Sequence, residues 1–195
     1  MRVIAGSARS LPLKTVRGSG TRPTTDRIKE TLFNMIAPRI PGSRFLDLFS
    51  GSGGIGIEAL SRGAAEAVFV ERERAALQVI RENLRFTHLE DRARILGMDA
   101  VRAVASMDGE KPFDVIFMDP PYSHELERRI LEILRESTIA DEDTLILIEA
   151  GADTDFSYLP ALGLEMSRDK RYGSNRHVFV RRSVVVQNSD LSGKL

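Results

Sequence analysis

The stretch that decides the fold is Phe45-Leu46-Asp47-Leu48-Phe49-Ser50-Gly51-Ser52-Gly53-Gly54-Ile55-Gly56. A short apolar run leads into a glycine-rich turn and then into a second apolar pattern. This order predicts a buried strand, a tight loop and the start of a helix. Glycines let a backbone approach a ligand closely, and a helix start offers free N–H groups. The stretch therefore predicts a ligand-binding turn between a strand and a helix.

Similar patterns of strand and helix continue along the chain. The expected strands are Arg44–Leu48, Ala67–Val70, Arg94–Leu96, Phe113–Met118 and Thr144–Ile148. The expected helices run from near Gly54 to about Arg62 and over Arg74–Phe86, Ala100–Met107 and Leu126–Glu136. This alternation predicts an α/β fold, with a parallel sheet and helices on both faces. After it, Leu162–Asp169 and His177–Arg181 predict an antiparallel hairpin that closes the last edge of the sheet.

The two ends of the chain differ from this central part. Residues 2–17 predict a short hairpin, and a helix follows that Thr24 or Thr25 can cap. We interpret 1–182 as a single domain in which 1–40 form a hairpin and helix extension. Residues 183–195 predict a polar tail that does not pack.

Composition narrows the class of protein. The 195 residues include 42% hydrophobic and 29% charged residues, as in an ordinary globular protein. No apolar run is long enough to span a bilayer, and the N-terminus has no secretory pattern. There is no cysteine, so disulfides, thiolate metal sites and thiol nucleophiles are excluded. The three histidines have no paired ligand spacing, so no metal site is predicted. We expect a cytoplasmic protein.

Charge is segregated along the chain although the formal net charge is zero. Residues 1–30 hold seven Lys and Arg against two acidic residues, and residues 168–182 hold six against one. Residues 31–167 hold 14 Lys and Arg against 24 Asp and Glu. Two basic ends flanking an acidic body predict a polyanionic partner, although solvated surface charge gives the same pattern.

A second decisive motif is Asp119-Pro120-Pro121-Tyr122, which follows an apolar run. Two prolines cannot continue a central strand, so the chain must turn where the strand ends. In an open α/β sheet, ligands bind at this edge. The turn places an acidic acceptor, a backbone carbonyl and an aromatic ring together. A flat base with an exocyclic amine needs acceptors and a stacking partner of this kind.

The glycine turn alone does not identify its ligand. Gly51, Gly53 and Gly56 fit a dinucleotide fingerprint, and Glu71 fits its ribose-binding acid. An NAD enzyme and an S-adenosylmethionine enzyme both match. Asp47 favours the second, because a carboxylate there would repel a pyrophosphate but attract an ammonium group. Asp99 can accept from an adenine amine, cap a helix, or do both.

Taken together, these motifs resemble those of class I S-adenosylmethionine-dependent methyltransferases. The chain most resembles the bacterial family that methylates the N2 amine of one guanine in small-subunit ribosomal RNA. The resemblance covers residues 1 to about 182 and rests on five segments: Arg2–Gly6, Arg22–Glu30, Phe45–Gly56, Asp119–Tyr122 and Lys170–Gly173.

The resemblance implies a Rossmann-like, mostly parallel sheet of about seven strands, the last strand antiparallel. It implies that the cofactor is S-adenosyl-L-methionine and that its site comprises Asp47, Phe49, Gly51, Gly53, Glu71, Arg72, Asp99, Ala100 and Asp119. The catalytic residues would be Asp119, Pro120 and Tyr122. RNA contacts are assigned to Arg22, Thr24, Arg27, Pro121, Arg171, Tyr172 and Arg176. The partner would be ribosomal RNA in the small subunit or its assembly intermediate, and we expect a monomer.

Other acceptors stay open, because the same turn serves adenine-N6 and protein-glutamine methyltransferases. The basic ends argue against a protein acceptor. A methyl transfer to a pyrimidine carbon requires a thiol adduct, which this chain cannot form through cysteine. An NAD(P)-dependent oxidoreductase is a more distant alternative, because little chain remains for a second catalytic domain.

Overall fold

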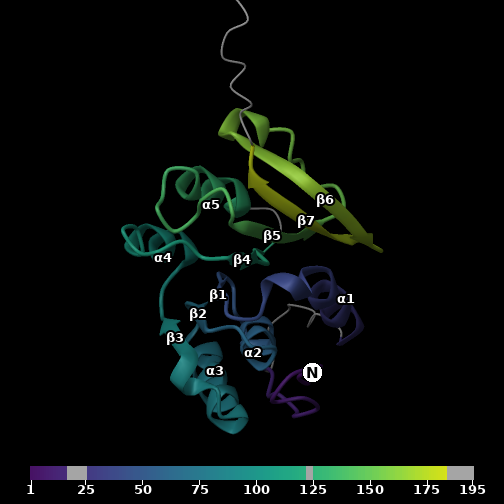
Figure 1. Cartoon of the computed structure of the whole chain (residues 1–195), viewed down its shortest axis with the longest axis vertical. Coiled ribbons are helices and arrows are strands. Elements are labelled where there is room, and N and C mark those ends of the chain that lie inside the picture. The colour runs from purple at the N-terminus through teal and green to yellow at the C-terminus, as the bar shows by residue number, and fades with distance from the viewer. Residues whose placement is uncertain (17–25, 122–124, 184–195) are drawn as a thin grey trace, which may run out of the picture.

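A computed structural model describes residues 1–16, 26–121 and 125–183 and centres on a seven-stranded sheet (Figure 1). The strands are β1 (Arg44–Asp47), β2 (Glu66–Val70), β3 (Ala93–Leu96), β4 (Val115–Met118), β5 (Leu145–Gly151), β6 (Leu164–Tyr172) and β7 (Asn175–Arg182). The α-helices are α1 (Asp26–Ile36), α2 (Gly54–Ser61), α3 (Arg74–Thr87), α4 (Ala100–Ser106) and α5 (Leu126–Leu134). Short 3₁₀ turns lie at Ala37–Arg39, Glu90–Arg92 and Pro160–Leu162.

The strand order is β3-β2-β1-β4-β5-β7-β6. The first five strands pair in parallel, whereas β7 is antiparallel to both β5 and β6. The predicted α/β class, parallel sheet and antiparallel last strand are confirmed. The strands of the last hairpin do not follow β5 in chain order, because the second strand of the hairpin, β7, pairs with β5. That pairing leaves β6 as the edge strand.

Helices cover both faces of the sheet, as predicted. One apolar cluster joins Phe45 and Phe117 to α1, α2 and α3, together with Val3 and Leu13 of the N-terminal segment. The other joins the alternate strand residues, such as Leu46, to α4 and α5. Successive residues of a strand point to opposite faces, so this alternation assigns a face to each position.

Alternation also decides where the polar residues at the strand ends lie. Phe45 and Leu147 belong to the cluster on the α1–α3 face, so Asp47 and Glu149, two residues further on, point to that face as well. The same count takes Phe117 to Asp119 at the end of β4. Three carboxylates on adjacent strands therefore meet at one edge of one face.

Element boundaries differ modestly from expectation. The first segment has one isolated antiparallel bridge, between Arg2 and Pro12, in place of a regular hairpin. Strand β4 begins at Val115, two residues later than expected, and β5 extends to Gly151 because β7 pairs with its end. None of the helices in the described ranges is long and apolar enough to cross a membrane.

A buried ion pair joins α1 to α2, and its carboxylate also holds the N-terminal segment. Lys29 Nζ lies 3.2 Å from Glu58 Oε2, and both side chains are almost completely buried. The Glu58 carboxylate also accepts from the N–H groups of Ile4 and Ala5 at 2.8 and 3.0 Å and from Arg62 Nε at 2.7 Å. Burial lowers the pKa of Lys29, which the neighbouring Glu58 opposes.

We expect Glu58→Ala to destabilise the protein strongly, by about 3–5 kcal/mol, because it leaves the buried Lys29 ammonium group without its counter-charge and two partly buried N–H groups without their acceptor. Urea unfolding measures this loss. Glu165→Ala is the matched control, since Glu165 forms an exposed pair with Arg181 at 2.6 Å. Its cost should stay below about 1 kcal/mol. Equal losses in the two variants would contradict the structural role of Glu58.

Candidate active site

An acidic residue lies at or just beyond the carboxyl end of each of the five consecutive parallel strands. Asp47 ends β1, Glu71 and Asp119 directly follow β2 and β4, Asp99 lies three residues beyond β3, and Glu149 lies near the end of β5. The sequence predicted the first four, and the fold brings them to one edge. In open α/β sheets this edge is where ligands bind.

The glycine turn forms the floor of the site. Gly51 has φ +53°, and a Cβ added there would have no described atom within 4 Å. Its N–H donates to Glu71 Oε2 at 2.9 Å, which ties the turn to the end of β2. At Gly56, on α2, a Cβ would lie 2.3 Å from the Phe69 ring, so only glycine lets the helix pack this closely on the sheet.

Asp47 is a buried carboxylate with one oxygen unused. Its Oδ2 accepts from the Gly56 N–H at 3.2 Å, whereas Oδ1 has no hydrogen-bond partner. Burial raises the pKa of Asp47 to about 7, and the charge of Glu71 adds to this rise. An orphaned buried acceptor of this kind needs a donor, and a cationic one best offsets the cost of burial.

Glu71 and Asp99 both hold backbone groups. Glu71 Oε1 accepts from the N–H groups of Arg72 and Glu73 at 2.8 and 2.9 Å, so the carboxylate is fixed at the rim. Asp99 caps α4 by accepting from the Arg102 N–H at 3.0 Å, with Ala100 buried directly behind it. Of the two roles predicted for Asp99, the cap is confirmed, and its second oxygen leaves the adenine role open.

Asp119 begins the proline turn at the end of β4. Burial raises the pKa of Asp119 to about 8, and repulsion from Glu149 and Asp47 contributes to the rise. Met118 pairs with Ile148, so Asp119 and Glu149 follow at the ends of neighbouring strands. Pro120 is buried and Pro121 is exposed. The raised pKa means that the ionised form of this carboxyl group is disfavoured unless a cation or a hydrogen-bond donor binds beside it.

Glu149 and its partners were not predicted from the sequence. Glu149 Oε2 lies 3.3 Å from His177 Nε2, and Oε1 accepts from Asn175 Nδ2 at 3.3 Å. Glu149 and His177 are both buried and face each other across the β5–β7 pair. A charged residue that ends the apolar run Leu145-Ile146-Leu147-Ile148 was the available signal, since the same pattern marks Asp47 and Asp119.

Some predicted site residues fall outside the described part of the chain. These are Tyr122, Arg22 and Thr24, so their roles stay predictions. Arg27 lies on the first turn of α1 with its side chain exposed. Phe49 packs partly buried beside the turn, and the Arg72 side chain is mostly exposed.

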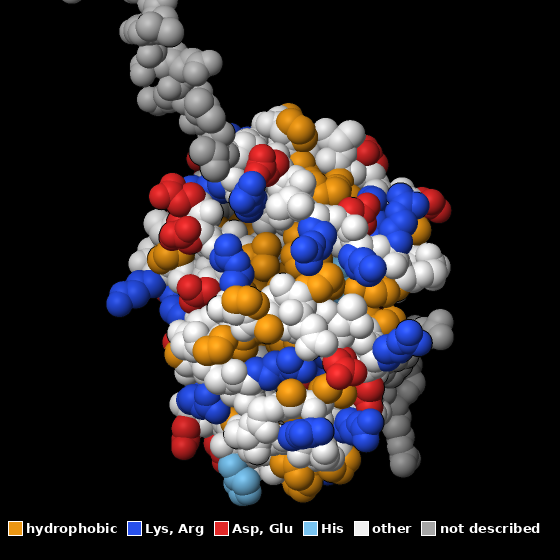
Figure 2. Space-filling model, turned by 45° about the vertical axis from the view of Figure 1, so that its right-hand side comes forward, with side chains coloured by type: hydrophobic (Ala, Val, Ile, Leu, Met, Phe, Trp, Pro, Cys, Tyr) orange, Lys and Arg blue, Asp and Glu red, His pale blue; other side chains and the backbone are white. Residues whose placement is uncertain are grey.

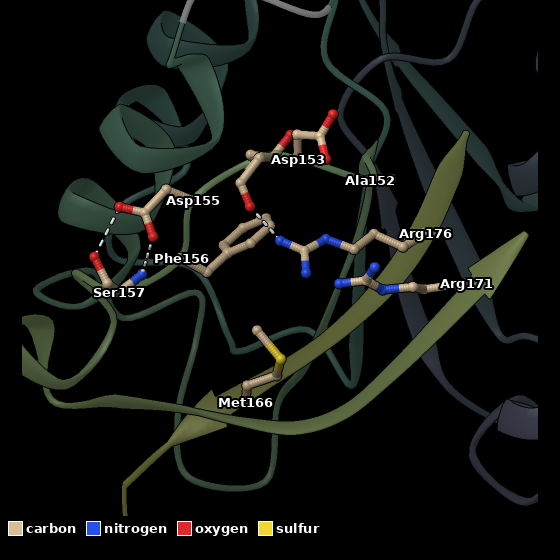
Figure 3. A pocket seen from close by; sticks show the side chains of 9 residues that line it. Ala152, Asp153, Asp155, Phe156, Ser157, Met166, Arg171 and Arg176 are labelled. Atoms are coloured by element: carbon tan, nitrogen blue, oxygen red, sulfur yellow. Dashed lines mark hydrogen bonds between the residues drawn. The ribbon is translucent and has the colours of Figure 1, made fainter. Parts of the chain in front are cut away.

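Two of the arginines assigned to RNA line an open hollow of about 480 Å³. Its wall is formed by the loop after β5 and by the β6–β7 hairpin, and both guanidinium groups point into it (Figure 3). Arg176 is buried over the Phe156 ring at 5.0 Å, donates to the Thr154 carbonyl and pairs with Asp169 at 3.1 Å. Arg171 is exposed, and within the described residues it makes no ion pair. Arg171 is therefore the freer of the two cations.

The hollow and the carboxylates lie on opposite faces of the sheet, because Arg176 and His177 are successive residues of β7. Tyr172 belongs to the side of His177, with the two rings edge to face at 5.1 Å. Its hydroxyl is buried without a partner, and burial raises its pKa. In Figure 2, lysine and arginine side chains lie among exposed hydrophobic ones across the visible surface.

Comparison with known proteins adds independent information. A family model described as "Conserved hypothetical protein 95" matches residues 1–181. A Bacillus subtilis (strain 168) protein named "Putative rRNA methyltransferase YlbH" is 43% identical over 89% of this chain and 94% of its own. The Escherichia coli (strain K12) "Ribosomal RNA small subunit methyltransferase D" is 36% identical over 83% and 80%. A solved structure, "Putative methyltransferase yhhF" from Escherichia coli, is 33% identical with a TM-score of 0.80, covering 94% and 98%.

The raised pKa of Asp119 makes a prediction for stability. When a carboxyl group has a higher pKa in the folded state than in the unfolded state, the folded protein loses stability as the pH rises between these two pKa values. We therefore expect ligand-free Asp119→Asn to be more stable than wild type, with an advantage that grows from pH 5 to pH 8 by up to about 1 kcal/mol per pH unit. Thermal unfolding across this range provides the measurement.

Asp155→Asn is the control of opposite sign. The backbone N–H and hydroxyl of Ser157 lower the pKa of Asp155, so its ionised form stabilises the fold. Removing that carboxylate should lower the melting temperature at pH 8. If the advantage of Asp119→Asn did not change with pH, Asp119 would not be a carboxyl group with a raised pKa.

Proposed function

The chain belongs to the conserved hypothetical protein 95 family, and from this premise we propose that it methylates the exocyclic N2 amine of a guanine in small-subunit ribosomal RNA with S-adenosylmethionine. The relatives described above all carry methyltransferase names, and the fold is the Rossmann-like fold of that class. The protein is a methyltransferase, and the resemblance found in the sequence is confirmed.

The observation that carries the proposal is the set of buried and partly buried carboxylates that line the edge of the sheet. S-adenosylmethionine, when bound, supplies a methyl carbon on a positively charged sulfur. The orphaned Oδ1 of Asp47 would accept from its ammonium group, and Glu71 would accept from the ribose hydroxyls. Space beside Gly51 allows a close approach, and Asp99 keeps an oxygen for the adenine amine. The residues present thus fit the group.

Asp119 and the Pro120 carbonyl would aim the acceptor nitrogen. The lone pair of a guanine N2 amine is delocalised into the ring, so the amine is a weak nucleophile. Hydrogen bonds from its two N–H groups to these acceptors would localise the lone pair and direct it at the methyl carbon. Tyr122 would stack on the flipped base, as aromatic side chains do in base-flipping enzymes.

Asp119 would also receive the proton that the nitrogen loses. After transfer, the methylated nitrogen carries an extra proton and a positive charge. A carboxylate with a pKa raised to about 8 holds that proton at neutral pH and releases it to water when the site opens. The same carboxylate would ionise beforehand, because a cationic ligand beside it offsets the repulsion from Glu149 and Asp47.

The rival functions fit less well. A pyrophosphate of NAD would meet the unpaired carboxylate oxygen of Asp47, which argues against an oxidoreductase. A protein glutamine would gain nothing from the basic ends of the chain. Ribosomal RNA in the small subunit, or in its assembly intermediate, is the partner that those ends favour. We further propose a cytoplasmic monomer, which requires no metal.

Asp119→Ala should lower methyl transfer to small-subunit rRNA by at least about 100-fold. The target amine loses a hydrogen-bond acceptor, and the proton released by the methylated nitrogen loses the carboxylate that would receive it. The assay uses labelled S-adenosylmethionine with unmodified ribosomal particles, and mass analysis of the nucleosides names the methylated atom. Calorimetry should show that the variant still binds S-adenosylhomocysteine and that wild type gives no heat with NADH. Wild-type activity in the variant would exclude the aiming role.

Arg171→Gln should weaken binding of small-subunit rRNA and reduce its salt slope by about 1, because one phosphate contact is lost. Arg171 is chosen because Arg176 is buried and its loss would also disturb the fold. Arg181→Gln is the matched control, since it removes the same charge from the far end of the hairpin. Filter binding at several salt concentrations measures the salt dependence of rRNA binding. Identical slopes for both variants and wild type would show that the hairpin tip is not part of the RNA-binding surface.

A further inference from the structure

The proline turn does not by itself select a base. Guanine N2 and adenine N6 are both exocyclic amines, and two acceptors in the turn serve either. The bases differ in the ring nitrogen beside the amine. In guanine N1 carries a hydrogen and is a donor, whereas in adenine N1 is an acceptor. An enzyme that flips a base reads it on this edge.

Glu149 is the acidic residue near the end of β5, the strand that neighbours β4 and its proline turn. It continues the β4–β5 register by one residue past Met118 and Ile148, so it stands beside Asp119 on the same face. Its charge contributes to the raised pKa of Asp119, which is consistent with this proximity. Besides Glu149, Asp47 is the other carboxyl group whose charge raises the pKa of Asp119, and Asp47 belongs to the cofactor side of the proposed site.

The Glu149 carboxylate is oriented by β7. Asn175 Nδ2 donates to one oxygen, and His177 Nε2 lies 3.3 Å from the other. Both partners come from the β7 side, and each carboxylate oxygen can accept more than one hydrogen bond. The group therefore keeps acceptor capacity while its direction is fixed. His177 is in turn packed against the Tyr172 ring, so it acts as a positioning residue.

We propose that Glu149 selects guanine by accepting the N1–H of the target base while Asp119 and the Pro120 carbonyl accept from its N2 amine. The base then lies with its N1 edge toward β5. Three acceptors match the three N–H groups of this edge, two on N2 and one on N1. Adenine bound in the same way would place its N1 lone pair against a buried carboxylate, which costs binding because neither group has a proton to share.

This inference rests on the proposed function, and one substrate analogue separates the two. 2-Aminopurine keeps the N2 amine but its N1 is an acceptor, as in adenine. It can be placed at the methylated position by ligating a synthetic oligonucleotide into the rRNA before reconstitution into particles. We expect wild type to methylate guanine at least about 100-fold more efficiently than 2-aminopurine in kcat/KM, because a site built to accept an N–H rejects an analogue that lacks it.

Glu149→Gln is the decisive variant. Glutamine has the same shape, and its amide can accept from N1–H of guanine or donate to N1 of 2-aminopurine. We expect guanine methylation to fall about 10-fold and the preference over 2-aminopurine to shrink to less than about 10-fold. An unchanged preference in this variant would overturn the proposal, as would equal methylation of both bases by wild type.

The controls distinguish other causes. Glu165→Gln removes a carboxylate from β6, where it pairs with Arg181, and should keep the wild-type preference. Melting temperature and S-adenosylhomocysteine affinity of Glu149→Gln should stay close to wild type, which shows that the change lies in base recognition. If wild type methylated neither guanine nor 2-aminopurine at the tested position but modified a different base of the particle, the proposed guanine-N2 function would fail. The selection of guanine by Glu149 would then fail with it. If guanine were methylated and the preference did not respond to Glu149, only the present inference would fail.

Discussion

Carboxylates that lie side by side, buried or partly buried, at the end of a parallel sheet are the constraint on which the rest of the site depends. Asp47, Asp119 and Glu149 face one side of adjacent strands. Burial raises the pKa values of Asp47 and Asp119; the charge of Glu71 adds to the rise at Asp47, and the charges of Glu149 and Asp47 add to it at Asp119. Such an arrangement costs stability in the free protein, because each ionised group lacks water. A ligand that brings positive charge and N–H donors offsets this cost. The cationic methyl donor and the amine of the proposed reaction would both meet this requirement.

Much of this site could be predicted from the sequence, because local rules fix its parts. Glycines mark the turn after β1, and two prolines mark the end of β4 after Met118. Because the strands are parallel, the charged residues at the ends of the apolar runs all lie at the same edge of the sheet. The series of strands and helices was predicted for the same reason, since the spacing of apolar residues sets both period and length. Boundaries moved by a few residues where long-range pairing, such as that of β5 with β7, extended a strand.

What the sequence did not predict depends on contacts between distant residues. Glu149 and His177 are 28 positions apart and meet because β7 enters the sheet between β5 and β6. A hairpin read from the sequence predicts that β6 and β7 pair, but not which of them pairs with β5. Arg176 shows the same limit. Its charge suggested an RNA contact, whereas the fold buries it over Phe156 and pairs it with Asp169.

The insertion of β7 next to β5 therefore does more than complete the sheet. Had β6 paired with β5, the partner of Glu149 would have been a different residue, and the carboxylate would have lost the imidazole and amide that orient it. The glycine turn and the proline turn supply the chemistry common to many amine methyltransferases. The identity of the accepted base depends on which groups surround that chemistry. We propose that Glu149 of β5 makes this choice in this chain and that the last hairpin orients its carboxylate, so base selection depends on the strand order as well as on the two motifs.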